Sequence, residues 1–169
     1  MTACLCALVV SFAAAQATDT TETVSGATNY ARLDANFATG GDTSADAFAT
    51  LKKMGFKTVI NLRTASEPGV DLAAEEKTVT AAGLRYVGLP FALGTADRAT
   101  VDTFLRVVKD GASQPVYIHC HSGQRANGFW LIKRVAVDGW TVEKALAEAD
   151  SLKVNPALRD FAVAYLQKR

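Results

Sequence analysis

The chain has little net charge, no long apolar run, and few cysteines and histidines. Its 18 Lys and Arg residues are balanced by 17 Asp and Glu residues, which leaves a net charge of +1. Binding to a nucleic-acid backbone needs a marked cationic excess on one face, so nucleic acid is excluded as the main partner, whereas a small pocket for one anion is not. The length of 169 residues predicts one domain.

The N-terminal 17 residues form a separate segment, because they carry no charge and end in small residues. This pattern is typical of a signal peptide, although basic residues are missing from its start. We expect a signal peptide over residues 1–17, a flexible tail over 18–28 and the folded domain over 29–169. The apolar stretch is shorter than the roughly 20 residues that span a bilayer, so we expect no stable membrane insertion after cleavage.

This segment predicts a periplasmic or secreted protein. An uncleaved apolar anchor or a chance alanine-rich start are the alternatives, and a misplaced start would make the protein cytoplasmic. The oligomeric state does not follow from the sequence.

The chain has three cysteines, and this odd number excludes a fully paired disulfide framework. Cys4 and Cys6 lie in the N-terminal segment and would leave with it. Cys120 would then have no internal partner in an oxidising compartment. It is therefore either a buried, inert thiol or a residue kept for its chemistry.

The two histidines, His119 and His121, flank Cys120. Neighbouring side chains on a strand point to opposite faces, so three consecutive residues cannot converge on one metal ion. A further cluster of ligands is also missing from the sequence. We therefore expect no metal site.

Short apolar runs alternate with helical patterns after residue 43. Strands are predicted over 58–62, 84–89 and 116–119, and the intervening segments have the spacing or capping residues of helices. This alternation predicts a single α/β domain with a mainly parallel central sheet flanked by helices. Ligands of such sheets bind beyond the carboxyl ends of the strands.

Cys120 lies at such a carboxyl end, between the strand 116–119 and a helix predicted from about residue 125. A helix N-terminus offers unpaired N–H groups and partial positive charge, which bind oxyanions and favour a thiolate. Gly123 permits a tight curl of the backbone, and Arg125 offers a planar fork of donors. These groups suit nucleophilic attack on phosphorus or sulfur.

Residues 119–125 resemble the signature of the cysteine-dependent protein tyrosine and dual-specificity phosphatases, which is His-Cys, five residues and Arg. Residues 30–41 and the strand ending in Asn61, Leu62 and Arg63 resemble the small bacterial phosphatase-like domain attached to β-lactamase-fold hydrolases. The resemblance implies a phosphotyrosine-phosphatase-like fold and no cofactor. It also implies hydrolysis of a phosphate monoester, on a small molecule or a phosphoprotein, through a phosphocysteine.

The same resemblance assigns roles to the residues of the loop. Cys120 would be the nucleophile and Arg125 would bind the phosphate oxygens. The rest of the phosphate-binding loop would be His121, Ser122, Gly123 and Gln124. Apart from the resemblance, we expect His119 to form a hydrogen bond beneath the loop and to help hold the thiolate, and His121 to be exposed at the rim.

The sequence departs from the phosphatase pattern at two positions. Only four residues separate Cys120 from Arg125, as in the small bacterial domain but also as in the active loop of rhodanese sulfurtransferases. Ala126 stands where the family usually has Ser or Thr, although Ser122 could partly substitute. Sulfur transfer through a Cys120 persulfide and a non-catalytic oxyanion-binding module are therefore the alternatives.

Other charged residues near the predicted strand ends have two interpretations each. Asp97 is the candidate general acid, or else the N-cap of the helix that follows it. Arg63 and Glu67 either line the site or, as we favour, form a surface or rim pair. Asp102 is expected on a solvated helix face.

Overall fold

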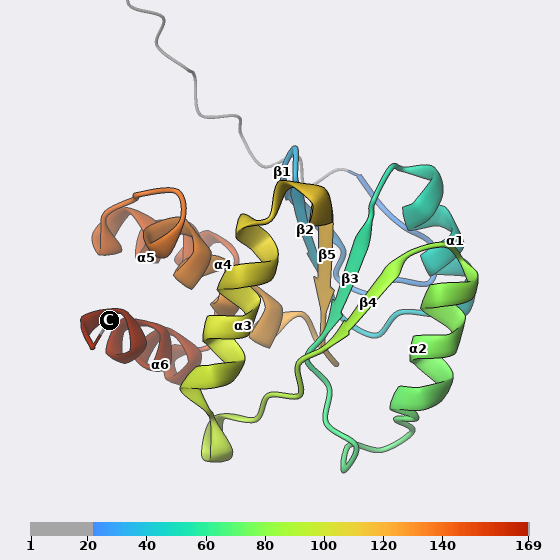
Figure 1. Cartoon of the computed structure of the whole chain (residues 1–169). Helices are drawn as coiled ribbons and strands as arrows, with labels where there is room; N and C mark the ends of the chain where they lie inside the picture. The colour runs from blue at the N-terminus through green and yellow to red at the C-terminus, as the bar shows by residue number, and fades with distance from the viewer. Residues whose placement is uncertain (1–21, 169) are drawn as a thin grey trace, which may run out of the picture.

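The computed structural model describes residues 22–168, which form a five-stranded sheet between two helical layers (Figure 1). The strand order is β1-β2-β5-β3-β4. The pairs β2–β5, β5–β3 and β3–β4 are parallel, and β1 pairs antiparallel with β2. The predicted α/β class with a mainly parallel sheet is thus confirmed. The strands are β1 (Ala31–Asp34), β2 (Phe37–Gly40), β3 (Thr58–Asn61), β4 (Arg85–Gly88) and β5 (Val116–His119).

The helices divide between the two faces of the sheet (Figure 1). The first two cover one face, and the other four cover the opposite face. The bounds are α1 (Ala45–Lys53), α2 (Leu72–Ala81), α3 (Arg98–Lys109), α4 (Gln124–Ala136), α5 (Val142–Ser151) and α6 (Pro156–Gln167), with single 3₁₀ turns at Leu93–Thr95 and Gly111–Ser113.

Helix starts follow the capping residues in the sequence. Ser44, Thr141 and Asn155 each accept a hydrogen bond from a backbone N–H in the first turn of α1, α5 and α6. Such caps satisfy N–H groups that have no partner within the helix. Pro156 opens α6, where its missing N–H costs nothing.

The central strand β5 is buried from both sides, which makes a rigid base for the segment after it. Val116 and Ile118 pack into the apolar cluster beneath α3–α6, and Tyr117 packs into the cluster beneath α1 and α2. The ring of Trp130 on α4 stacks on Phe37 of β2 with a centroid distance of 4.8 Å. The helix that follows Cys120 is therefore fixed to the sheet by aromatic packing.

The hairpin of β1 and β2 is not among the predicted strands. It places Gly40 beside His119 in the parallel register of β2 and β5. Residues 41 and 42 consequently lie next to the segment that follows β5, where the backbone N–H of Asp42 donates to the carbonyl of His121 at 2.9 Å. The segment that follows the hairpin therefore borders the carboxyl edge of the sheet.

The folded domain begins earlier than residue 29. Val24 is 4% exposed, the carbonyl of Gly26 accepts from the N–H of Ser44 at 2.8 Å, and Ala27 forms a β-bridge with Thr43. The flexible tail predicted over 18–28 is therefore wrong for residues 24–28, because Val24 is buried and the backbone of residues 26–28 is bonded to residues 41–44 before α1. The predicted signal peptide lies outside the described residues. Between residues 22 and 168, no helix is long and apolar enough to cross a membrane.

Candidate active site

Cys120 occupies the junction of β5 and α4, at the carboxyl edge of the sheet. Cys120 is buried, with only 1% of its surface exposed. Gly123 directly precedes α4 with a φ of 84°, a left-handed conformation that glycine adopts without strain. In this conformation the N–H of Gly123 donates to Sγ of Cys120 at 3.2 Å. The sulfur thus faces a backbone donor and the positive end of a helix, a setting that suits an anionic sulfur.

Two carbonyls of the loop 120–125, those of His121 and Ser122, are bonded to neighbouring segments. The carbonyl of His121 accepts from Asp42, and that of Ser122 accepts from Nδ2 of Asn29 at 3.2 Å. The side chain of Gln124 also points outward, since its Oε1 accepts from the N–H of Asn155 at 2.7 Å. With these two carbonyls bonded to other segments, the loop can turn successive N–H groups inward toward an oxyanion.

Arg125 is held from behind by three carbonyl or carboxylate partners. Its Nη1 donates to the carbonyls of Leu62 and Phe91 at 3.0 and 2.9 Å. Both Nη atoms donate to Glu67, at 2.7 Å to Oε1 and 2.8 Å to Oε2. Burial lowers the pKa of Arg125, but its hydrogen bonds to Glu67 and the charge of Cys120 outweigh burial and raise that pKa above its ordinary value. The guanidinium is therefore a fixed, permanent positive charge beside the sulfur.

Glu67 belongs to the site, which corrects the interpretation that Arg63 and Glu67 form a surface or rim pair. The pair exists, with Nε of Arg63 3.3 Å from Oε2 of Glu67, but its side chains are only 15% and 21% exposed. The hydrogen bond from Arg125 is the main reason that the pKa of Glu67 falls to about 2, with Thr64 and Arg63 adding to it against the effect of burial. The sequence placed both residues after β3, but did not show that Glu67 bonds to Arg125.

Asp42 is the site residue that sequence reasoning missed. Its Oδ1 lies 2.6 Å from Nη1 of Arg63, and its Oδ2 lies 2.7 Å from Nδ1 of His121. The signal was its position directly after two glycines and a strand, which remained hidden because β2 was not predicted. His121 is exposed at the rim as expected, with 66% of its side chain accessible.

These contacts join into one chain of alternating basic and acidic side chains that begins and ends on the loop. We call it the charged arch, and it consists of His121, Asp42, Arg63, Glu67 and Arg125. Each link is between 2.6 and 3.3 Å long. The arch ties the first and last side chains after Cys120 to segments that follow β2 and β3.

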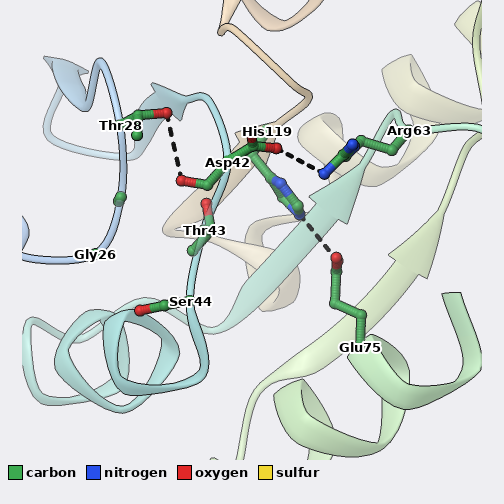
Figure 2. Close-up of a pocket in the computed structure, with 9 residues that line it drawn as sticks. Gly26, Thr28, Asp42, Thr43, Ser44, Arg63, Glu75 and His119 are labelled. Carbon is green, nitrogen blue, oxygen red and sulfur yellow. Dashed lines mark hydrogen bonds and ion pairs between the residues drawn. The ribbon is translucent and has the colours of Figure 1, made fainter. Parts of the chain in front are cut away.

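His119 faces away from the loop, into the layer beneath α1 and α2. Its ring stacks on Tyr117 with centroids 5.8 Å apart, and its Nε2 lies 3.0 Å from Oε1 of Glu75 (Figure 2). The hydrogen bond predicted from His119 to the loop is therefore replaced by one to α2, and Nδ1 has no partner within residues 22–168. The reason is the alternation of side chains along β5, which sends His119 to the face opposite Ile118.

A cavity of about 420 Å³ adjoins this histidine (Figure 2). Asp42 and Arg63 of the charged arch line it, together with Glu75 and Thr43. The cavity therefore lies next to the arch and carries both signs of charge on its wall.

Asp97 lies directly before α3, where its Oδ1 accepts from the N–H of Ala99 at 2.9 Å. The N-cap interpretation is thus confirmed, while the role of general acid stays a prediction. Asp102 is exposed on α3 as expected, and it also accepts a hydrogen bond from the hydroxyl of Tyr165. Ala126 is fully buried, so its methyl group supplies no hydroxyl beneath the loop.

Metal ligands are not grouped in the described residues: between 22 and 168, no three His, Cys, Asp or Glu side chains are placed to hold one ion. The site consists instead of a buried sulfur, backbone N–H groups and a fixed guanidinium. This arrangement can bind a tetrahedral oxyanion against the sulfur.

Comparison with known proteins relates the chain to phosphatases. The model of a family described as DSP-PTPase phosphatase fused to NAD+ kinase matches residues 7–150. A rice protein (Oryza sativa subsp. japonica) assigned as chloroplastic NAD kinase 2 is 33% identical over 93 residues, which are 54% of this chain and 10% of that protein. A β-lactamase hydrolase-like protein of Agrobacterium fabrum is 31% identical over 110 residues, 64% of this chain and 25% of that protein. The matched segments are thus a quarter or less of these relatives' length.

Solved structures share the fold. TpbA of P. aeruginosa superposes with a TM-score of 0.65 at 24% identity, covering 84% of this chain and 85% of that chain. The catalytic core of the PP-IP phosphatase SIW14 of S. cerevisiae gives a TM-score of 0.69 at 16% identity, covering 85% and 88%. The resemblance to the cysteine-dependent phosphatases predicted from residues 119–125 is confirmed.

Proposed function

Because the chain belongs to the family of DSP-PTPase phosphatases fused to NAD+ kinase, we propose that it hydrolyses a phosphate monoester through a phosphocysteine on Cys120. The observation that carries the proposal is the meeting of three groups at one point. The N–H of Gly123 donates to Sγ of Cys120, and Arg125 lies near enough to the same cysteine for the charge of its sulfur to help raise the arginine's pKa. A nucleophile and its oxyanion donors are thereby in place before substrate binds.

The reaction would have two steps. In the first, Sγ of Cys120 attacks phosphorus, the S–P bond forms, and the bond to the leaving oxygen breaks as that oxygen takes a proton. In the second, water attacks phosphorus, the S–P bond breaks, and inorganic phosphate leaves the restored thiolate. Loop N–H groups and Arg125 would hold the equatorial oxygens in both steps.

Candidate substrates are phosphorylated small molecules and phosphoproteins. Support comes from proteins of the same fold: one TpbA variant was solved in complex with phosphotyrosine, and SIW14 is a PP-IP phosphatase. The charged arch and the neighbouring cavity offer polar contacts to the organic part of such a substrate.

The test is turnover of p-nitrophenyl phosphate between pH 5 and 7 by the purified protein. We expect Cys120→Ser to abolish turnover, and we expect ³²P-labelled substrate to leave a covalent label on the sulfur of the wild-type protein after rapid denaturation. The variant should still bind phosphate, because its loop N–H groups and Arg125 are unchanged. Wild-type protein that leaves aryl phosphates intact would contradict the proposal.

Sulfur transfer is the second candidate, favoured by the four-residue spacing between Cys120 and Arg125. Thiosulfate would pass its outer sulfur to Cys120, releasing sulfite, and cyanide would then remove that sulfur as thiocyanate. A mass gain of one sulfur on Cys120, without phosphatase turnover, would establish this function. A non-catalytic oxyanion-binding module, favoured by the buried methyl of Ala126, would bind phosphate without either reaction.

Export also remains a proposal, supported by the uncharged residues 1–17. Fractionation of cells expressing the full chain, with N-terminal sequencing of the recovered protein, tests it. We expect a mature N-terminus near residue 18 in the periplasm or medium, and an intact N-terminus in the cytoplasm would contradict this.

A further inference from the structure

His121 is the side chain directly after the sulfur, and its ring is held in one orientation. Nδ1 lies 2.7 Å from Oδ2 of Asp42, while the backbone carbonyl of His121 accepts from the N–H of Asp42 at 2.9 Å. The two residues are therefore joined twice, once through side chains and once through backbone. This double contact fixes the imidazole relative to the loop that carries Cys120.

Asp42 is itself immobilised from its other side. Its Oδ1 lies 2.6 Å from Arg63, whose Nε reaches Glu67 and, through it, Arg125. The carboxylate thus has one oxygen for an arginine and one for the histidine. A carboxylate that accepts a hydrogen bond from Nδ1 orients the imidazole and keeps one proton on Nδ1. Nε2 is then the nitrogen that can gain or lose a proton.

Nε2 lies on the opposite side of the ring from this carboxylate, and the side chain is 66% exposed. Of the charged groups near this ring, Asp42 bonds to it directly, Arg63 pairs with the other oxygen of Asp42, and Glu75 lines the same cavity as Asp42. Cys120 directly precedes His121 in the chain. Histidine is also the side chain whose charge changes closest to neutral pH.

Asp97 is less well placed for the same work. Its Oδ1 already accepts a hydrogen bond from the N–H of Ala99 in the first turn of α3. The segment before Asp97 lies at the surface, where Leu93 is 40% exposed. It has no place in the charged arch, whereas His121 begins it.

We propose that His121, oriented by Asp42, is the catalytic acid and base of this phosphatase; this assignment rests on the proposed function. In the first step, Nε2–H gives its proton to the leaving oxygen as the S–P bond forms and the P–O bond breaks. In the second step, the neutral Nε2 takes a proton from the attacking water as the S–P bond breaks. The proton count of the enzyme is thereby restored after each turnover, and Asp42 is a positioning residue.

The test compares two substrates that differ in how much their leaving groups need a proton. p-Nitrophenolate leaves without one, whereas the phenolate of phenyl phosphate benefits from general acid catalysis. Three variants are compared: His121→Asn, Asp42→Asn and Asp97→Asn. His121→Asn is informative because its side-chain amide can still donate to Asp42 in place of Nδ1 but carries no acid in place of Nε2.

For His121→Asn we expect kcat/KM on phenyl phosphate to fall about 100-fold and on p-nitrophenyl phosphate less than about 10-fold. The limb of the wild-type pH profile that falls toward alkaline pH on phenyl phosphate should disappear in this variant. Asp42→Asn should show a smaller loss with the same dependence on the leaving group. Asp97→Asn, which preserves the N-cap, should show no such dependence.

Equal losses on both substrates in His121→Asn, or full activity, would overturn the assignment, because a structural role does not depend on the leaving group. A leaving-group dependence found only in Asp97→Asn would assign the acid to Asp97 instead. Failure of the proposed function itself has a different signature, since wild-type protein would then show no Cys120-dependent turnover of either substrate.

Discussion

Glu67 holds Arg125 with both carboxylate oxygens, at 2.7 and 2.8 Å, and so closes the charged arch at the end of the loop. The carbonyls of Leu62 and Phe91 also accept from Nη1. The guanidinium is thereby oriented by the segments that follow β3 and β4. A fixed donor needs no reorganisation when charge develops on a phosphate.

Replacing Glu67 with Gln should weaken catalysis more than folding. The amide keeps the size of the side chain but loses the charge and one of the two acceptors for Arg125, so the guanidinium is less well oriented. We expect kcat/KM on p-nitrophenyl phosphate to fall roughly 10- to 100-fold, in line with the cost of misplacing a positioned group. Steady-state kinetics measure this directly.

The control is Glu76→Gln, an exposed residue of α2 with the same change of charge. Its activity should equal that of the wild type. A similar loss in both variants would mean that net charge, and not the contact with Arg125, determines the effect.

The contact also predicts how stability depends on pH. In the folded protein the pKa of Glu67 falls from 4.5 to about 2, chiefly because of the hydrogen bond from Arg125. A carboxyl whose pKa is depressed by folding stabilises the protein above its unfolded pKa and loses that contribution as pH falls through the folded value. We therefore expect roughly 1–2 kcal/mol, after allowance for solvent screening, to disappear between pH 4.5 and 2.

Urea unfolding at pH 6, 4 and 2.5 checks this, with Glu67→Gln beside the wild type. The difference between the two proteins should shrink as the pH falls, because protonation removes the same charge that the substitution removes. A difference that stays constant down to pH 2.5 would contradict the predicted linkage.

Gly123 gives a test of the loop geometry. Its φ of 84° is strained for any other residue, while an added Cβ would stand 3.5 Å from Gly40, which is ordinary contact. Gly123→Ala should therefore cost about 1 kcal/mol in unfolding free energy through backbone strain alone. Because the same backbone turn directs the N–H at Sγ of Cys120, we also expect kcat/KM to fall at least about 10-fold.

Gly139 is the matched control, since it has a φ of 71° and no atom within 4 Å of an added Cβ. Gly139→Ala should lose a similar amount of stability and keep full activity. Thermal unfolding and kinetics of both variants separate strain from function. Activity that is unchanged in Gly123→Ala would show that the donor to sulfur is dispensable.

Much of this site could be predicted from the sequence because its chemistry is local. Cys120, Gly123 and Arg125 lie within six residues, and a buried strand before them and a helix after them determine how they meet. The parallel sheet could likewise be predicted from three short apolar runs separated by capped helices. Each of these inferences uses neighbours in the chain.

The charged arch could not be predicted, because it joins segments after three different strands. Asp42 follows β2, a strand that the sequence did not predict. Its four residues, Phe37 to Gly40, neither alternate between apolar and polar side chains nor form a run of β-branched residues. Arg63 and Glu67 were placed at the correct edge, but opposite charges four residues apart also fit an exposed pair. Only the strand order, with β5 between β2 and β3, shows that all of them face the loop.

A second network, at the far end of α4, should affect stability without affecting the site. Glu148 of α5 accepts from Nε1 of Trp130 at 2.8 Å and from Nε and Nη2 of Arg134 at 3.0 Å each. Arg134 also lies 4.0 and 4.1 Å from the ring centroids of Trp130 and Trp140. The side chains of Arg134 and Glu148 are only 10% and 14% exposed.

Glu148→Ala would leave a buried guanidinium and an indole N–H without this acceptor, so we expect the free energy of unfolding to fall by about 3 kcal/mol. Glu143→Ala, at an exposed position of the same helix, should change it by less than about 1 kcal/mol. Chemical denaturation of both variants measures the difference. Because Arg134 lies nine residues beyond Arg125, about 14 Å along the helix, kcat/KM of folded Glu148→Ala should equal that of the wild type. A lower value at a temperature where the variant is fully folded would show that the orientation of α4 depends on this network all the way to the phosphate-binding loop.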